Sequence, residues 1–127
     1  MAAVAVLVLS STALASAPAP RAASPKAMVA DVHRAAEQIQ RELRMARAHL
    51  GPEAARCVSG KLSMAHAEAR IAERHLSGLR AATARGDRRA QAQHRAGLFI
   101  AKAHAQDLSR SVVSCLSFAS TERVVRR

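Results

Sequence analysis

The residues best suited to covalent chemistry are two cysteines, Cys57 and Cys115, in a chain of 127 residues. Gly86 lies midway between them, 29 residues from each. In an antiparallel helical hairpin that turns at Gly86, both cysteines would lie at the same height. A disulfide needs Cα atoms roughly 4.4–6.8 Å apart, which packed helices allow. The spacing therefore predicts a Cys57–Cys115 disulfide, the alternative being two buried free thiols in a cytosolic helix pair.

Six histidines are the other candidate ligands, but none of them forms an i, i+4 pair or a His-Glu-x-x-His motif. In the same hairpin register, facing positions have residue numbers that sum to 172. Glu68 would then face His104, and His75 would lie within about a turn of His94. This arrangement permits a metal site between helices without indicating one. We expect solvated histidines, no bound metal and no cofactor.

Enzyme motifs are missing from the sequence. No serine lies in a Gly-x-Ser-x-Gly elbow, no glycine-rich phosphate loop is present, and the nine acidic residues are dispersed. The chain has two Phe and no Trp or Tyr, which disfavours a large apolar pocket for a small-molecule substrate. We expect no catalytic residues and a protein that is not an enzyme.

Positive charge dominates the chain, with 20 Lys and Arg against nine Asp and Glu and a net charge of +11. Five arginines crowd the predicted hairpin tip and form a candidate anion-binding site: Arg80, Arg85, Arg88, Arg89 and Arg95. Such a patch attracts anionic polymers or membrane surfaces. The alternative is that arginine only solvates alanine-rich helices. Nucleic acid is disfavoured because aromatic residues for base stacking are scarce.

Three heptad stripes of apolar residues, in alternating steps of three and four, predict the helices that position these groups. The first stripe comprises Val29, Val32, Ala36, Ile39, Leu43, Ala46 and Leu50. The second comprises Val58, Leu62, Ala65, Ala69, Ala72, Leu76 and Leu79. The third comprises Leu98, Ala101, Ala105, Leu108, Val112, Cys115 and Ala119.

Helix boundaries are marked by capping residues. Ser24-Pro25 favours a helix start, and Gly51-Pro52 favours a turn followed by a second start. Gly86 suits the end of the second helix, and Asp87 suits the cap of the third. The predicted fold is all-α: a long antiparallel helical hairpin with a preceding helix, either as a three-helix bundle or with that helix laid along the hairpin.

Additional apolar residues lie beside the third stripe. They are Phe99, Ile100, Val113, Leu116 and Phe118. We expect them to widen the apolar face so that this helix contacts more than one neighbour.

The N-terminal segment resembles a targeting sequence. Residues 2–15 form an apolar run ending in Ala13-Leu14-Ala15, which has the small-x-small form of a cleavage site. The run is shorter than the roughly 20 residues of a membrane-spanning helix. We therefore predict a signal peptide at 1–15, a flexible linker at 16–25 and a single helical domain at 26–127, the alternative for the first segment being a disordered or fraying alanine-rich N-terminus. The protein would be exported, either periplasmic or secreted, and would not span the membrane.

One local motif carries a resemblance to a protein family. It reads Arg56-Cys57-Val58-Ser59-Gly60-Lys61-Leu62-Ser63. With Cys115, it loosely resembles small secreted helical-hairpin proteins of high-GC bacteria, of the myxobacterial type, in which two cysteines bracket the hairpin. The resemblance covers about residues 56–117. It implies a fold and a compartment but no functional residues.

Two hypotheses for function remain. The first is an interaction or scaffold protein of the cell envelope whose helical surface binds another protein. The second is a basic helical protein that binds an anionic polymer or a membrane surface.

Overall fold

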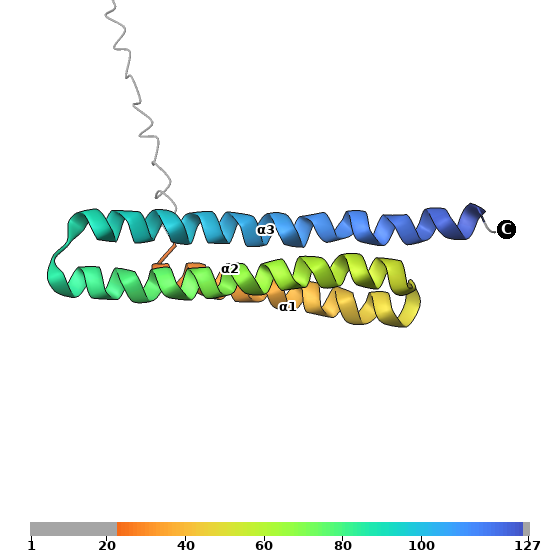
Figure 1. Ribbon diagram of the computed structural model, residues 1–127, viewed down its shortest axis with the longest axis horizontal. Helices are drawn as coiled ribbons and strands as arrows, with labels where there is room; N and C mark the ends of the chain where they lie inside the picture. Colours follow the sequence, from red (N-terminus) through yellow and green to blue (C-terminus); the bar gives the residue numbers. More distant parts are fainter. Residues whose placement is uncertain (1–22, 126–127) are drawn as a thin grey trace, which may run out of the picture.

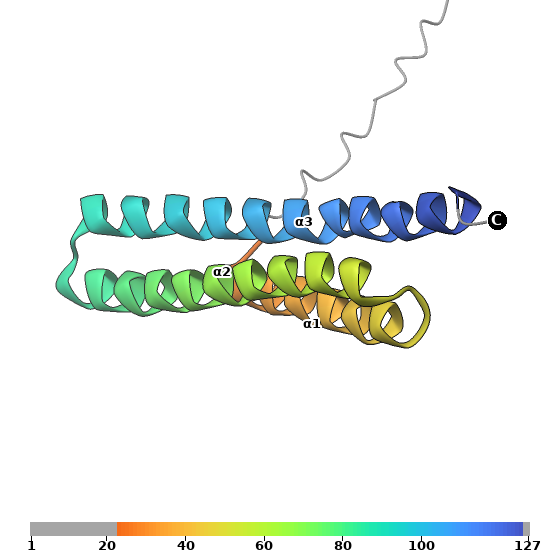
Figure 2. The same ribbon diagram turned by 45° about the vertical axis from the view of Figure 1, so that its right-hand side comes forward.

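The computed structural model describes the backbone of residues 23–125 and the side chains of residues 23–117. It contains three helices, α1 (Pro25–His49), α2 (Pro52–Arg85) and α3 (Arg88–Val125). Figures 1 and 2 show them side by side along one long axis. The described part of the chain has no strand, which confirms the all-α prediction. The predicted signal peptide and most of the predicted linker lie outside the described residues.

Both predicted side-chain caps are present. The Ser24 Oγ accepts a hydrogen bond of 3.1 Å from the backbone N–H of Ala27, and the Asp87 Oδ1 accepts one of 3.0 Å from the N–H of Ala90. The two interhelical turns use Gly51 at φ 101° and Gly86 at φ 69°. These values lie in the region that glycine enters without steric cost. The helix ends thus follow directly from local sequence chemistry.

The core is built from the three predicted stripes. Nearly every stripe position that the structure describes is buried, and Leu50, Leu62 and Leu76 are partly buried. One cluster of buried side chains lies toward the α2–α3 turn and includes Val32, Leu79 and Leu98. A second cluster lies toward the disulfide and includes Ile39, Val58, Val112 and Cys115. The side chain of Ala119 is outside the described residues.

Helix α1 packs against both α2 and α3, so the fold is a three-helix bundle. Because α1 is shorter than its neighbours, it does not cover the whole hairpin. Figures 1 and 2 show the α2–α3 turn extending past the start of α1. The tip of the molecule is therefore a two-helix structure.

The prediction that extra apolar residues widen the buried face of α3 is wrong for three of them. Phe99, Ile100 and Val113 are 58%, 55% and 65% exposed. Leu116 is partly buried against the second cluster, and the side chain of Phe118 is not described. Helix α3 does contact two neighbours, but through its narrow stripe. Alanine fills much of that stripe, so the helices lie close together along a narrow interface. The residues beside the stripe stay outside this interface.

Leu98 is expected to be a main contributor to stability because it is fully buried in an alanine-rich core. Leu98→Ala should lower the free energy of unfolding by about 3 kcal/mol. Ile100→Ala on the same helix removes an exposed side chain and should change it by less than about 0.5 kcal/mol. Urea melts of both variants measure the difference. Equal effects would contradict the assignment of the buried face.

Candidate functional site

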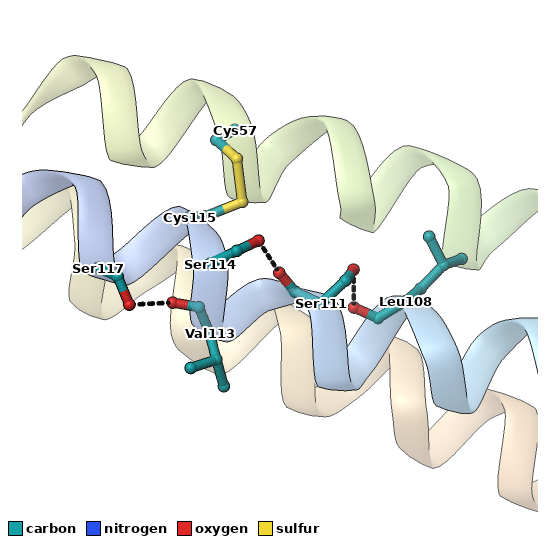
Figure 3. Close-up of a disulfide and its surroundings, with 7 residues drawn as sticks. All are labelled: Cys57, Leu108, Ser111, Val113, Ser114, Cys115 and Ser117. Carbon is teal, nitrogen blue, oxygen red and sulfur yellow. Dashed lines mark hydrogen bonds between the residues drawn. A yellow bond between two sulfur atoms is a disulfide. The ribbon is translucent and has the colours of Figure 1, made fainter.

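The disulfide joins α2 to α3 near the end of the bundle opposite the Gly86 turn. The Cα atoms of Cys57 and Cys115 lie 5.6 Å apart, and the predicted pairing is confirmed. Figure 3 shows the bond bridging the two helices. Cys115 is fully buried, whereas Cys57 is exposed beside the buried Val58. The bond thus runs from the rim of α2 into the interface.

Serines surround Cys115 on α3, and their hydroxyls bond within the helix. Ser111 donates to the carbonyl of Leu108 at 2.8 Å, and Ser114 donates to that of Ser111 at 2.6 Å (Figure 3). Such bonds to the preceding turn satisfy a serine hydroxyl inside a helix. Neither hydroxyl is paired with a general base here, so the geometry of an activated nucleophile is not built at these two serines.

Two histidines form interhelical contacts with glutamates. His104 Nδ1 lies 3.2 Å from the Glu68 Oε1, which confirms that these positions face each other. His33 Nε2 lies 2.9 Å from the Glu73 Oε1 and links α1 to α2. Both histidines are exposed, and contacts of this kind contribute modestly to stability.

His75 and His94 form a direct pair between α2 and α3. Their Nδ1 atoms are 3.2 Å apart and partly buried, and the ring centroids are 5.5 Å apart. Each ring packs against a glycine of the opposite helix. A Cβ at Gly78 would lie 2.3 Å from the His94 ring, and a Cβ at Gly97 would lie 2.3 Å from the His75 ring. Neither glycine could be replaced without displacing a ring.

The sequence carries a signal for this packing in its glycines, although no histidine motif marks it. Gly97 faces His75 and Gly78 faces His94 in the same register that pairs the cysteines. Both glycines lie inside helices, where each costs up to about 1 kcal/mol relative to alanine. A glycine in mid-helix usually has a packing or functional reason.

An ion-pair network links α1 to α3. Lys102 Nζ lies 2.8 Å from the Asp31 Oδ2, and Arg34 pairs with the same carboxylate. The hydrogen bond from Lys102 holds the pKa of Asp31 below its ordinary value, outweighing the partial burial that would raise it. Next to it, a groove of about 420 Å³ lies between α1 and α3, lined mainly by charged and amide side chains. Binding sites for drug-sized ligands are instead mostly apolar.

The five arginines proposed for anion binding are all exposed. Arg80 and Arg85 lie near the end of α2, while Arg88, Arg89 and Arg95 lie in the first turns of α3. Both groups are therefore at the two-helix tip (Figure 1). Among the side chains that the structure describes, no ion pair involves any of the five.

Exposed apolar side chains form the other notable surface feature. Phe99 and Val113 are 14 residues apart, close to four helical turns, and therefore share one face of α3. Ile100 lies next to Phe99, and Met64 and Ile71 are exposed on one face of α2. We call the three α3 residues Phe99, Ile100 and Val113 the α3 apolar surface.

Residues 23–117 contain no group of three or more His, Cys, Asp or Glu side chains that could hold a metal ion. No helix in the described part of the chain is long and apolar enough to cross a bilayer. No protein-family model, curated protein or solved structure matches the sequence or the fold of this chain.

The disulfide is expected to stabilise the bundle because it closes a long segment, the cysteines being 58 positions apart in sequence. Reducing it should cost about 2–4 kcal/mol of unfolding free energy. Cys57→Ser and Cys115→Ser should each lower stability by a similar amount in denaturant melts. Reduction of either variant should then cause no further loss. A wild-type protein equally stable with and without reductant would show that the bond does not constrain the unfolded chain.

Proposed function

We propose that this chain is an exported, non-enzymatic helical protein that acts in the cell envelope by binding a protein partner. The observation that carries the proposal is the exposure of Phe99, Ile100 and Val113 on α3. The buried stripe of the same helix, in contrast, is filled mainly by small residues. Large exposed apolar side chains often mark an interaction site. Phe99 and Ile100 are adjacent, and Val113 lies about 21 Å further along the same helix. An aromatic side chain at such a site commonly carries much of the binding energy.

Charge indicates what kind of partner would fit. The chain has a net charge of +11, so a surface of opposite sign would be attracted to it and oriented by it. We therefore propose a partner with an apolar contact surface surrounded by acidic side chains. Its association rate should fall as salt rises, since screening shortens the range of attraction.

Export is supported by three observations of different kinds. The N-terminal sequence has the apolar run and the small-x-small cleavage motif of a signal peptide, and the cysteines are paired as expected for an oxidising compartment. The motif around Cys57 resembles secreted hairpin proteins. Together they favour the periplasm or the exterior as the place of action.

Photo-crosslinking tests the partner proposal. A photoreactive phenylalanine analogue in place of Phe99 should give one discrete adduct with a second protein in an envelope fraction. Unlabelled wild-type protein should compete for the adduct, whereas a Phe99→Ser/Ile100→Ser variant should compete at least about thirtyfold less well, corresponding to roughly 2 kcal/mol of lost contact energy.

The control places the same analogue at Gln40, an exposed position on α1. An equal adduct from Gln40, or a double variant that competes as well as the wild type, would rule out the α3 apolar surface. An adduct between two copies of this chain would contradict a partner of different sequence and would indicate self-association instead.

The second candidate function is binding of an anionic polymer or membrane surface by the two-helix tip. It is favoured by the exposure of all five tip arginines and by the lack of an ion pair to any of them in the described structure. Asp87, the nearest acidic residue in sequence, uses its carboxylate to cap α3. The guanidinium groups are thus available to phosphate or carboxylate ligands.

Neutralising the tip tests this candidate. The Arg85→Gln/Arg88→Gln/Arg89→Gln variant should keep its helical content, because none of the three side chains is buried. Its binding to heparin or to anionic vesicles at low salt should fall by at least about tenfold, and wild-type binding should weaken steeply as salt is added. Equal binding by the variant and the wild type would leave the arginines a solubilising role only.

A further inference from the structure

We propose that the His75–His94 pair is a binding site for a divalent transition metal, with Cu²⁺ bound more tightly than Ni²⁺ or Zn²⁺. The site would use the two Nδ1 atoms as ligands, one from α2 and one from α3. Two or more coordination positions would remain for water or for an exogenous ligand. This inference is independent of the partner and anion-binding proposals.

The distance between the two nitrogen atoms fits a metal ion. Nitrogen ligands bound at about 2.0–2.1 Å lie roughly 3.3 Å apart in a tetrahedral site. In adjacent positions of a square-planar site, the preferred geometry of Cu²⁺, they lie roughly 2.9 Å apart. The observed separation of 3.2 Å falls between these values. The two nitrogen atoms are therefore already at a suitable separation, and binding requires that both Nδ1 lone pairs turn toward the ion.

The surrounding residues hold the rings in place. Each imidazole occupies the space that a Cβ would fill on the opposite helix, at Gly78 and at Gly97. Glycine is costly inside a helix, so both positions sacrifice helix stability to accommodate a ring. Ligands fixed in this way lose little entropy when the metal binds. The pairing of two histidines with two glycines is thus a constructed site rather than a chance contact of two flexible side chains.

The choice of metal follows from ligand type and charge. Imidazole suits Cu, Ni and Zn, and among divalent ions Cu²⁺ binds nitrogen sites most tightly. Arg74 and Arg95 adjoin the two histidines in sequence, and the chain as a whole is strongly basic, which disfavours any dication. No acidic ligand joins the pair within the described residues. Only an ion with a strong preference for imidazole should overcome this repulsion, and Mg²⁺ and Ca²⁺ should not bind.

Calorimetric titration of the full, disulfide-bonded protein with Cu²⁺, Ni²⁺, Zn²⁺ and Mg²⁺ in a non-chelating buffer tests the site. We expect one Cu²⁺ per chain at this site, weaker binding of Zn²⁺ and none of Mg²⁺. His75→Gln and His94→Gln should each weaken Cu²⁺ binding by more than about tenfold. Changing a residue that only supports a metal ligand already costs about tenfold, and these changes remove a ligand itself. The matched control, His66→Gln, replaces an exposed histidine of α2 and should leave affinity unchanged.

Two further measurements extend the test, and the first uses only the wild-type protein and so does not depend on how a variant folds. On the wild-type protein, Zn²⁺ should shift the imidazole NMR signals of His75 and His94 before those of the other histidines. Gly97→Ala should weaken Cu²⁺ binding while both ligands remain, because the new Cβ displaces the His75 ring. Cu²⁺ binding that survives His75→Gln and His94→Gln, or Zn²⁺ shifts confined to other histidines, would overturn the proposal. Absence of Cu²⁺ binding to the wild-type protein would also contradict the proposal and would mean that the two histidines only bond to each other.

Discussion

Helices α2 and α3 pair antiparallel about Gly86, and this register determines which side chains meet across the hairpin. Four facing pairs have residue numbers that sum to the same value. They are Cys57 with Cys115, Glu68 with His104, His75 with Gly97, and Gly78 with His94. A constant sum along this length means that both helices rise equally per residue, without a bulge. The disulfide holds one end of the register and the Gly86 turn holds the other.

Small side chains along the interfaces explain how few bulky residues support so long a bundle. Alanine fills many stripe positions, which lets the helices lie close together but buries little apolar area at each contact. Most of the hydrophobic stabilisation then comes from residues such as Ile39, Val58 and Leu98. A narrow interface also leaves Phe99 and Ile100 uncovered. The exposed apolar surface is thus a direct result of how the core is packed.

Much of this fold could be predicted from the sequence because its signals are local or periodic. Ser24 and Asp87 cap helices through contacts within one turn, and the equal spacing of the cysteines about Gly86 indicated both the disulfide and the facing of Glu68 and His104. The burial of positions beside the stripes could not be predicted in this way, since it depends on how closely the helices approach. The packing of the histidine rings on the two glycines could not be predicted for the same reason, because it too depends on how closely the helices approach. The Lys102–Asp31 contact was also missed, because no sequence pattern fixes the rotation of α1 against α3.

The bundle divides into a covalently tied end and an open tip, and its candidate sites follow that division. The cysteines and the histidine pair lie about 27 Å apart along α2, at a rise of 1.5 Å per residue. The histidine pair lies near the level where α1 begins, since the start of α1 packs in the same cluster as Leu79 and Leu98. Arg95 lies at that level, next to His94, and Arg85, Arg88 and Arg89 lie beyond it toward the Gly86 turn. A metal ion at the histidine pair would hold α2 and α3 together near the end of the three-helix region, where α1 begins. It would also add positive charge beside the arginines, so metal and anion binding at the tip would favour each other, and this coupling must be reciprocal.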